Sequence, residues 1–265
     1  MYHIPQLAVK YLQYMLTAKN GKGHGIHSPF VYELVRNVFN DPSKPAGWHE
    51  IEALRKLLLK DNTLLQVNDF GAGSSKGHTK QRRIRQIAGA ALKTPKYAQL
   101  LYHLVAYFQP RNILELGTSL GITTAYLASA IKASKVITLE GADAIAQVAK
   151  QHFQRLQLNN IQLVAGHFDE TLSSVLNEER RVDFVFVDGN HAYEPTLRYF
   201  KTIMPFTHAD TVMIFDDIHW SAEMEKAWDA IRNDSAVTLS IDLFFMGIVF
   251  FRSQQHEKQH FTIRY

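Results

Sequence analysis

The sequence predicts an α/β fold: a doubly wound, mostly parallel seven-stranded sheet that ends in an antiparallel hairpin and is preceded by a helical region. Three observations predict it. From residue 112 onward, short apolar runs alternate with amphipathic helical segments, which is typical of strands joined by helical crossovers. The last two runs are separated only by a tight turn around Met246 and Gly247. That turn is too short for a parallel crossover, so these runs form a hairpin at the sheet edge. Before residue 112, helical periodicity dominates between glycine-rich breaks.

The composition is that of a folded globular protein. Of the 265 residues, 46% are hydrophobic and 20% are charged, which excludes a disordered or fibrous chain. The absence of cysteine excludes disulfides, thiolate nucleophiles and cysteine-bound metals, and it agrees with a reducing compartment. The N-terminus lacks the pattern of a signal peptide, and the longest apolar run, residues 243–251, is far shorter than the roughly 20 residues of a membrane helix. We therefore expect a cytoplasmic protein with no membrane partner.

Two regions are expected along the chain. Residues 1–93 are interpreted as an N-terminal helical cap or lid, and residues 94–265 as the main α/β domain. Ser28 followed by Pro29 predicts a helix start, because serine caps helices and proline favours the first helical position. The helices expected up to residue 108 cover residues 4–18, 29–38, 48–60, 81–92 and 95–108.

The second region is expected to alternate strands and helices. The strands cover residues 113–116, 135–139, 161–165, 182–187, 211–215, 237–244 and 247–251. The helices between them cover residues 122–131, 142–156, 171–176, 194–203 and 222–233. Ligands of such sheets bind at the carboxyl ends of the strands, so the residues that directly follow each strand are the candidates for function.

A basic stretch begins in the glycine-rich segment DFGAGSSKG, residues 69–77. The net charge of the chain is +4, and no acidic residue lies between residues 70 and 114. The cations of this stretch are Lys76, Lys80, Arg82, Arg83, Arg85, Lys93 and Lys96. Two interpretations are open: a solvated helix face, or a lid that closes over an anionic ligand with Gly71, Gly73 and Gly77 as hinges. The segment lacks the lysine and hydroxyl pair of a phosphate-binding P-loop.

The first strand is followed by the polar, glycine-containing turn ELGTSLGI, residues 115–122. Gly117 and Gly121 allow close approach of a ligand to the backbone, and Thr118 and Ser119 offer hydroxyls before a helix N-terminus. The three-glycine spacing of the NAD fingerprint is missing, which disfavours a dehydrogenase. Glu140 ends the second strand, 23 residues after Gly117 (140 − 117). Its carboxylate can accept both hydroxyls of a ribose, or it can cap the following helix.

Five segments together resemble one enzyme family. They are TPKYAQLLYHLV (94–105), ILELGTSLGITTAYLA (113–128), VITLEG (136–141), FVFVDGNHAYE (184–194) and VMIFDDIHW (212–220). The combination resembles class I S-adenosylmethionine-dependent methyltransferases, and is most similar to the catechol and caffeoyl-CoA O-methyltransferase group. The resemblance covers residues 94–252 and implies that residues 94–265 form a Rossmann-like methyltransferase domain.

The resemblance implies a binding site for S-adenosylmethionine. Gly117, Thr118 and Gly121 would line its methionine end, and Glu140 would hold its ribose. The turn formed by Gly166, His167 and Phe168 would flank the adenine, although ordinary loop packing is the alternative for these residues. The complete set of candidate cofactor-binding residues is Glu115, Gly117, Thr118, Ser119, Gly121, Glu140, Gly166, His167, Phe168 and Asp188.

The family also holds a divalent metal with Asp, Asp and Asn, which implies Asp188, Asp216 and Asp217 here. Asp217 stands where the family has asparagine. All-oxygen ligands suit Mg²⁺, Ca²⁺ or Mn²⁺, and we expect Mg²⁺. The alternative for Asp216 or Asp217 is a helix cap or a ligand of the cofactor's amino group.

The resemblance places two residues at the chemistry, Asp188 and His191. His191 stands where the family commonly carries a lysine base, and histidine can accept a proton near neutral pH. Its alternative role is to cap the helix that begins near Glu194. His219 and Trp220 either face the acceptor or serve packing.

The leading functional hypothesis is therefore methyl transfer to a hydroxyl of a small-molecule acceptor, assisted by a metal. Two alternatives stay open: an RNA methyltransferase that uses the basic segment 76–96, and a cofactor-binding module without catalysis. Salt dependence separates the first alternative, because binding to phosphates weakens steeply as salt rises. The apolar cluster Phe244, Phe245, Phe250 and Phe251 on the final hairpin also makes a homodimer conceivable.

Overall fold

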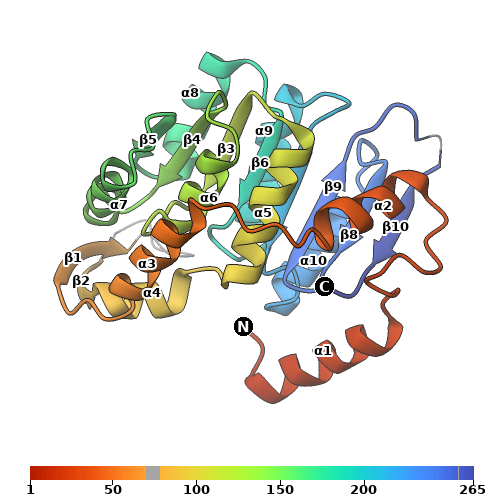
Figure 1. The fold of residues 1–265 in the computed structure, drawn as a ribbon, viewed down its shortest axis with the longest axis horizontal. Helices are drawn as coiled ribbons and strands as arrows, with labels where there is room; N and C mark the ends of the chain where they lie inside the picture. The colour runs from red at the N-terminus through yellow and green to blue at the C-terminus, as the bar shows by residue number, and fades with distance from the viewer. Residues whose placement is uncertain (70–77, 256) are drawn as a thin grey trace. The chain divides into compact units, whose positions relative to one another are not determined.

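The structure, a computed structural model, describes residues 1–69, 78–255 and 257–265. It confirms the α/β fold, with a mostly parallel sheet that contains an antiparallel hairpin; the sheet has eight strands, one more than expected (Figure 1). The chain divides into two compact units, residues 42–180 and residues 1–41 with 181–265. The predicted boundary after residue 93 stays a prediction, because units of packing need not follow units of sequence. Lys76 and the predicted hinges Gly71, Gly73 and Gly77 lie outside the described residues.

The unit of residues 42–180 contains three parallel strands in the order β3 (Asn112–Leu116), β4 (Lys135–Glu140) and β5 (Ile161–Ala165). The helices α6 (Ile122–Ala130) and α7 (Asp143–Arg155) connect them, and α8 (Phe168–Glu179) follows β5. Leu116 pairs with Leu139, and Glu140 pairs with Ala165. The carboxyl ends of these strands therefore lie at one edge, where the turns after β3, β4 and β5 come together.

The N-terminal part of this unit departs from the all-helical expectation. It contains α3 (Trp48–Leu58), β1 (Leu64–Asp69), β2 (His78–Arg83), α4 (Ile84–Ala91) and α5 (Pro95–Phe108). The helix expected over residues 81–92 begins only at Ile84, because residues 78–83 pair antiparallel with residues 64–69. The polar run before Ile84 shows no strand alternation, so this pairing depends on a partner that local sequence does not reveal.

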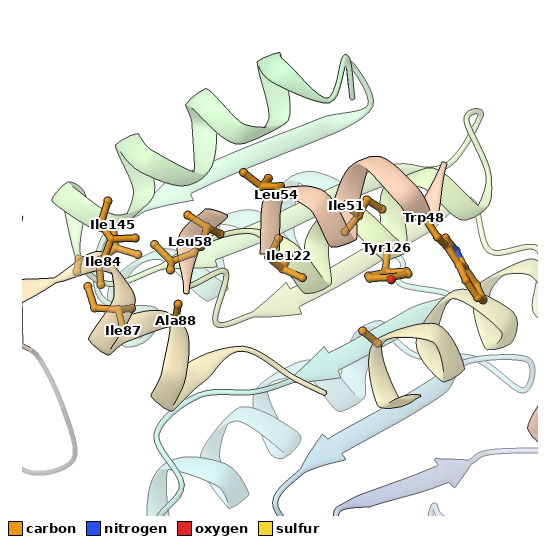
Figure 2. Close-up of a cluster of buried hydrophobic side chains, with 14 of the residues drawn as sticks. Trp48, Ile51, Leu54, Leu58, Ile84, Ile87, Ala88, Ile122, Tyr126 and Ile145 are labelled. Atoms are coloured by element: carbon orange, nitrogen blue, oxygen red, sulfur yellow. The ribbon is translucent and has the colours of Figure 1, made fainter. Parts of the chain in front are cut away.

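One hydrophobic core joins these N-terminal elements to the crossover helices (Figure 2). Ile51 and Leu54 of α3 belong to the same buried cluster as Ile122 and Tyr126 of α6. α7 contributes Ile145 to this cluster. A helix buried in this way loses much apolar contact if it moves, so the packing favours α3 and α4 as a fixed support rather than a mobile lid.

The other unit contains five strands in the order β10 (Gln259–Thr262), β8 (Leu239–Asp242), β9 (Met246–Phe250), β7 (Val212–Asp216) and β6 (Phe184–Val187). The helices α9 (Tyr193–Ile203) and α10 (Ala222–Arg232), with the short 3₁₀ turn Met204–Phe206, accompany them. The predicted hairpin is confirmed, because β8 and β9 pair antiparallel. Its placement at the sheet edge is wrong, because β10 pairs parallel with β8 on the outer side. The four-residue strand β10 is short and partly polar, so no apolar run marked it.

The same unit carries the N-terminal elements α1 (Ile4–Thr17) and α2 (Pro29–Leu34), which continues into a π-helical turn (Val35–Phe39). The predicted cap at Ser28 is confirmed, since its Oγ accepts the backbone N–H of Val31 at 3.5 Å. Tyr11 and Tyr14 of α1 pack on Phe244, which is 2% exposed. α1 thus covers part of the predicted aromatic cluster, and a homodimer stays a prediction. Among the described residues, none of the helices has the length and hydropathy needed to cross a membrane.

Candidate active site

The turn after β3 is fixed to the end of β4 by its own backbone. The N–H groups of Gly117 and Thr118 both donate to the carbonyl of Leu139, at 3.0 and 3.2 Å. The hydroxyls of Thr118 and Thr138 are 2.6 Å apart and buried. These contacts leave the Thr118 hydroxyl in the protein interior, and they order the turn before any ligand binds.

Glu115 supports this turn from within the sheet. Its side chain is completely buried, and its Oε2 accepts the hydroxyls of Thr124 at 2.5 Å and Thr138 at 2.7 Å. Thr138 in turn contacts Thr118. Glu115 therefore links β3, β4 and α6, and this geometry favours positioning of the turn over direct ligand contact. The sequence interpretation missed Thr124 and Thr138.

Glu140 clamps the turns after β3 and β4 together. Its Oε2 accepts the backbone N–H of Ser119 at 2.8 Å, and its Oε1 accepts the N–H of Ala142 at 3.0 Å. Burial raises the pKa of Glu140, and the backbone N–H groups that it accepts oppose this rise. The bond to Ala142 reaches the N-cap residue just before α7, rather than an N–H of the helix itself. A carboxylate has about four lone-pair sites, so these two bonds leave room for ribose hydroxyls as well.

The turn after β3 contains a buried hydroxyl that a ligand could satisfy and a glycine that the packing requires. The Oγ of Ser119 is buried and lacks a hydrogen-bond partner within the described part of the chain. A buried hydroxyl without a partner is costly, and a polar ligand atom would satisfy it. Gly121 also has a packing role. A Cβ there would lie 2.6 Å from the ring of Phe153 on α7, and its φ is +81°. Gly121 is thus required for helix packing, and ligand approach at this glycine stays a prediction.

The turn after β5 combines a tether and a helix cap. Gly166 donates its N–H to the carbonyl of Glu140 at 2.9 Å. His167 is the N-cap of α8, and its Nδ1 accepts the N–H of Asp169 at 3.3 Å. Phe168 is half-buried. This local arrangement supports the packing alternative for His167, while an adenine contact by His167 or Phe168 stays a prediction.

In the other unit, the ends of β6 and β7 bring three candidate residues together. Asp188 follows β6, and Asp216 ends β7, which runs parallel to β6. His191 lies in the turn before α9, and its Nε2 is 3.5 Å from Oδ1 of Asp188. One ligand atom from each of Asp188, His191 and Asp216 lies within 4.8 Å of the others. Two carboxylate oxygens and an imidazole nitrogen at these separations can hold one divalent cation.

The third predicted metal ligand is not a member of this group. Asp217 adopts a left-handed conformation with φ +53°, its N–H donates to the carbonyl of Phe245 at 2.6 Å, and its carbonyl accepts the N–H of Trp220 at 2.9 Å. Within the described residues, the group consists of Asp188, His191 and Asp216. The capping alternative for Asp216 and Asp217 does not apply to α10, because Ser221 is its N-cap and accepts the N–H of Met224 at 3.2 Å.

The contacts of His219 favour a structural packing role over contact with the methyl acceptor. Its Nε2 lies 2.8 Å from Asp242 Oδ2 and its Nδ1 lies 3.0 Å from Glu225 Oε1, so both ring nitrogens are engaged. The ring stacks on Phe244. Burial lowers the pKa of His219, but its hydrogen bonds to the carboxylates of Asp242 and Glu225 outweigh this effect, so the pKa lies above its usual value.

Comparison with known proteins agrees with the geometry. Residues 114–218 match a methyltransferase domain family. A catechol O-methyltransferase of Niastella koreensis is 29% identical over 128 residues, which is 47% of this chain and 57% of that protein. An O-methyltransferase of Aspergillus hancockii is 29% identical over 136 residues, or 49% of this chain and 52% of that protein. The chain thus spans a little over half the length of these two relatives.

Solved structures of low sequence identity share the fold. An O-methyltransferase from Bacillus cereus in complex with SAH aligns with a TM-score of 0.57 and 20% identity, over 80% of this chain and 93% of the other. The SAH-bound Podospora anserina methyltransferase PaMTH1 aligns with a TM-score of 0.59 and 12% identity, over 96% and 98% of the two chains. Residues 114–218 are thus similar to a methyltransferase domain, and the chain shares its fold with these methyltransferases.

Proposed function

We propose that the protein transfers a methyl group from S-adenosylmethionine to a hydroxyl of a small molecule, with a divalent cation at Asp188 and Asp216. The observation that carries this proposal is the group of Asp188, His191 and Asp216, whose ligand atoms lie within 4.8 Å of one another. Many class I methyltransferases share the fold, and function is decided at the site. A cation-binding group at the ends of β6 and β7 supports transfer to an oxygen that a cation can polarise.

The turns after β3, β4 and β5 are proposed to hold the cofactor. Ser119 offers a buried hydroxyl, and Glu140 offers lone pairs to ribose hydroxyls. Gly117 and Thr118 would line the methionine end, and Phe168 the adenine. In the reaction the sulfonium carbon–sulfur bond would break, a carbon–oxygen bond would form, and the acceptor hydroxyl would release its proton to solvent water. The products would be a methyl ether, S-adenosylhomocysteine and one proton.

The relatives support one class of acceptor. One of them is named a catechol O-methyltransferase, and we propose an aromatic acceptor with vicinal hydroxyls, two oxygens that one cation can bind together. The cation supplies charge that makes loss of the hydroxyl proton easier. The RNA methyltransferase and the non-catalytic module have less support, because the relatives that match are O-methyltransferases.

The test combines binding and turnover. Calorimetry should detect S-adenosylmethionine and S-adenosylhomocysteine, and labelled methyl groups should appear on a catechol in the presence of Mg²⁺ or Mn²⁺. Excess chelator should stop transfer while cofactor binding continues. Absence of cofactor binding in the folded protein contradicts the proposal, and full turnover in excess chelator removes the metal from it.

A further inference from the structure

We infer that His191 is a metal ligand rather than the base, and that its nitrogen makes the site prefer Mn²⁺, Co²⁺ or Zn²⁺ over Mg²⁺. The inference rests on the proposed function, because it concerns the cation proposed there. It changes two expectations from the sequence: the role of His191, and Mg²⁺ as the expected ion.

The separations are close to those of ligands around a single ion. Protein nitrogen and oxygen ligands lie about 2.0–2.2 Å from a transition metal, so two ligands at right angles are about 3.0 Å apart and two opposite ligands about 4.3 Å apart. The Nε2 of His191 is 3.5 Å from Asp188 Oδ1. All three ligand atoms lie within 4.8 Å of one another. A base must keep its ring nitrogen for the acceptor proton, whereas here Nε2 faces the carboxylate of Asp188.

The side chain of His191 does not cap the following helix, so its ring can serve as a metal ligand. Asn190 adopts a left-handed conformation with φ +55°, and its carbonyl accepts the N–H of Ala192 at 2.6 Å. α9 begins at Tyr193, and its N-cap is Ala192, which offers no capping side chain. His191 is therefore not the N-cap of α9, which was its alternative role. Its side chain is 31% exposed, beside Asp188 at 15%.

The charge balance also favours this ligand set. Asp188 and Asp216 carry two negative charges and neutral imidazole adds none, so a divalent cation is neutralised. With Asp217 in place of His191, three carboxylates would surround the ion and leave one excess negative charge. In the structure the turn at Asp217 is held by its backbone bonds to Phe245 and Trp220, and Asp217 is not in the group.

A nitrogen ligand changes which ion binds best. Carboxylate oxygens suit Mg²⁺, Ca²⁺ and Mn²⁺, whereas imidazole suits Zn²⁺, Fe²⁺, Ni²⁺ and Cu²⁺ and adds affinity along the series from Mn²⁺ to Cu²⁺. Mg²⁺ demands near-ideal octahedral oxygen coordination. We therefore expect Co²⁺ to bind at least about 10-fold more tightly than Mg²⁺, or about 1.4 kcal/mol.

The experiment measures metal binding on the full chain without any acceptor. Calorimetry with Mg²⁺, Mn²⁺ and Co²⁺ is carried out on the wild type and on His191→Gln, whose side-chain oxygen reaches about as far as Nε2 and makes the site all-oxygen. His208→Ala is the matched control, because His208 Nε2 pairs with Asp183 at 2.9 Å in the same unit. Pulsed electron paramagnetic resonance of bound Mn²⁺ reports directly whether a ¹⁴N nucleus is coordinated.

The inference expects a ¹⁴N coupling in the wild type and in His208→Ala that is lost in His191→Gln, together with loss of the preference for Co²⁺. Equal affinity for Mg²⁺ and Co²⁺, a wild-type spectrum without nitrogen coupling, or a coupling that persists in His191→Gln overturns it. If His191→Gln does not fold, the presence or absence of a ¹⁴N coupling in the wild-type spectrum decides the question. Methyl transfer with Mg²⁺ and no nitrogen coupling refutes this inference and leaves the proposed function standing, whereas a missing cofactor complex refutes the function itself.

Discussion

His152 on α7 fixes the turn that follows β3, because its Nδ1 lies 2.9 Å from the backbone carbonyl oxygen of Leu120. The side chain of Leu120 is completely buried in the core cluster of the same unit. Leu120 is thus held at two points: its carbonyl by His152 and its side chain by the core cluster. Burial lowers the pKa of His152, and the bond to Leu120 opposes this shift only in part.

We expect His152→Ala to lower the free energy of unfolding by about 1–2 kcal/mol, because a buried carbonyl loses its donor. Affinity for S-adenosylmethionine should fall as well, since the turn that carries Ser119 is loosened. His152→Asn is the matched variant, because its amide can donate from near the position of Nδ1. Calorimetry should find affinity retained in His152→Asn and reduced in His152→Ala; equal affinity in both contradicts the positioning role.

The lowered pKa of His152 also predicts a pH dependence. The folded protein keeps the ring neutral below its usual value of 6.5, whereas the unfolded chain takes up a proton there. Stability from this group is therefore present above pH 6.5 and is lost as the pH falls below it, towards the folded-state pKa. In urea denaturation between pH 8 and pH 5, the free energy of unfolding should fall less in His152→Asn than in the wild type. Parallel curves would show that His152 does not titrate in this way.

Gly121 should not tolerate a side chain. In Gly121→Ala the new methyl meets the ring of Phe153 at 2.6 Å, and the backbone is held at φ +81°. The left-handed conformation costs about 1–2 kcal/mol and overpacking about 1–3 kcal/mol, so we expect a loss of about 2–5 kcal/mol. Gly89 of α4 is the control, since nothing lies within 4 Å of its Cβ position. Gly89→Ala should stabilise by about 0.5–1 kcal/mol. A denaturant midpoint unchanged by Gly121→Ala would rule out the clash.

The sequence predicts the sheet well where strands are buried and apolar. The strands at 113–116 and 135–139 match β3 and β4 within one residue. Burial on both faces produces continuous apolar runs, which are visible locally. β2 and β10 escape prediction because their residues are polar and their strand state depends on partners, residues 64–69 and 239–242, that are distant in sequence.

The same contrast holds for the site. The positions of Glu140, Asp188 and Asp216 follow from the rule that ligands bind after parallel strands, and the family resemblance adds their roles. Their supports do not follow from any local pattern. The contact of His152 with Leu120 joins residues 32 positions apart, and that of Glu225 with Tyr2 joins residues 223 apart. Only the folded chain reveals which polar groups share one partner.

Loss of the Glu140 charge should weaken cofactor binding more than it lowers the free energy of unfolding. Glu140→Gln keeps one carbonyl acceptor for a backbone N–H but loses the charge, so we expect affinity for S-adenosylmethionine to fall about 10-fold, or about 1.4 kcal/mol. Glu140→Ala removes the bonds to Ser119 and Ala142 as well, and should also lower stability by about 1–3 kcal/mol. Calorimetry and denaturation together separate the two effects. Unchanged affinity in folded Glu140→Gln rejects the ribose contact.

The last prediction concerns the attachment of α1 through Glu225. Tyr2 donates its hydroxyl to Glu225 Oε2 at 2.6 Å, Lys10 Nζ lies 2.9 Å from both carboxylate oxygens, and His219 contacts Oε1 at 3.0 Å. Burial raises the pKa of Glu225, but the hydrogen bonds from Tyr2, Lys10 and His219 outweigh it and hold the pKa below its usual value.

Because these three groups share one acceptor, Glu225→Ala should release α1 and lower the free energy of unfolding by about 1–3 kcal/mol. Glu223→Ala on the same helix is the control, since Glu223 accepts the N–H of Tyr193 at the long distance of 3.4 Å. The lowered pKa means that the contribution of Glu225 is present above pH 4.5 and is lost as the pH falls through the folded-state value. Limited proteolysis at pH 7 should cut within residues 1–20 faster in Glu225→Ala than in Glu223→Ala. Equal cleavage in both variants would mean that the contacts of Tyr11 and Tyr14 with Phe244 alone hold α1 in place.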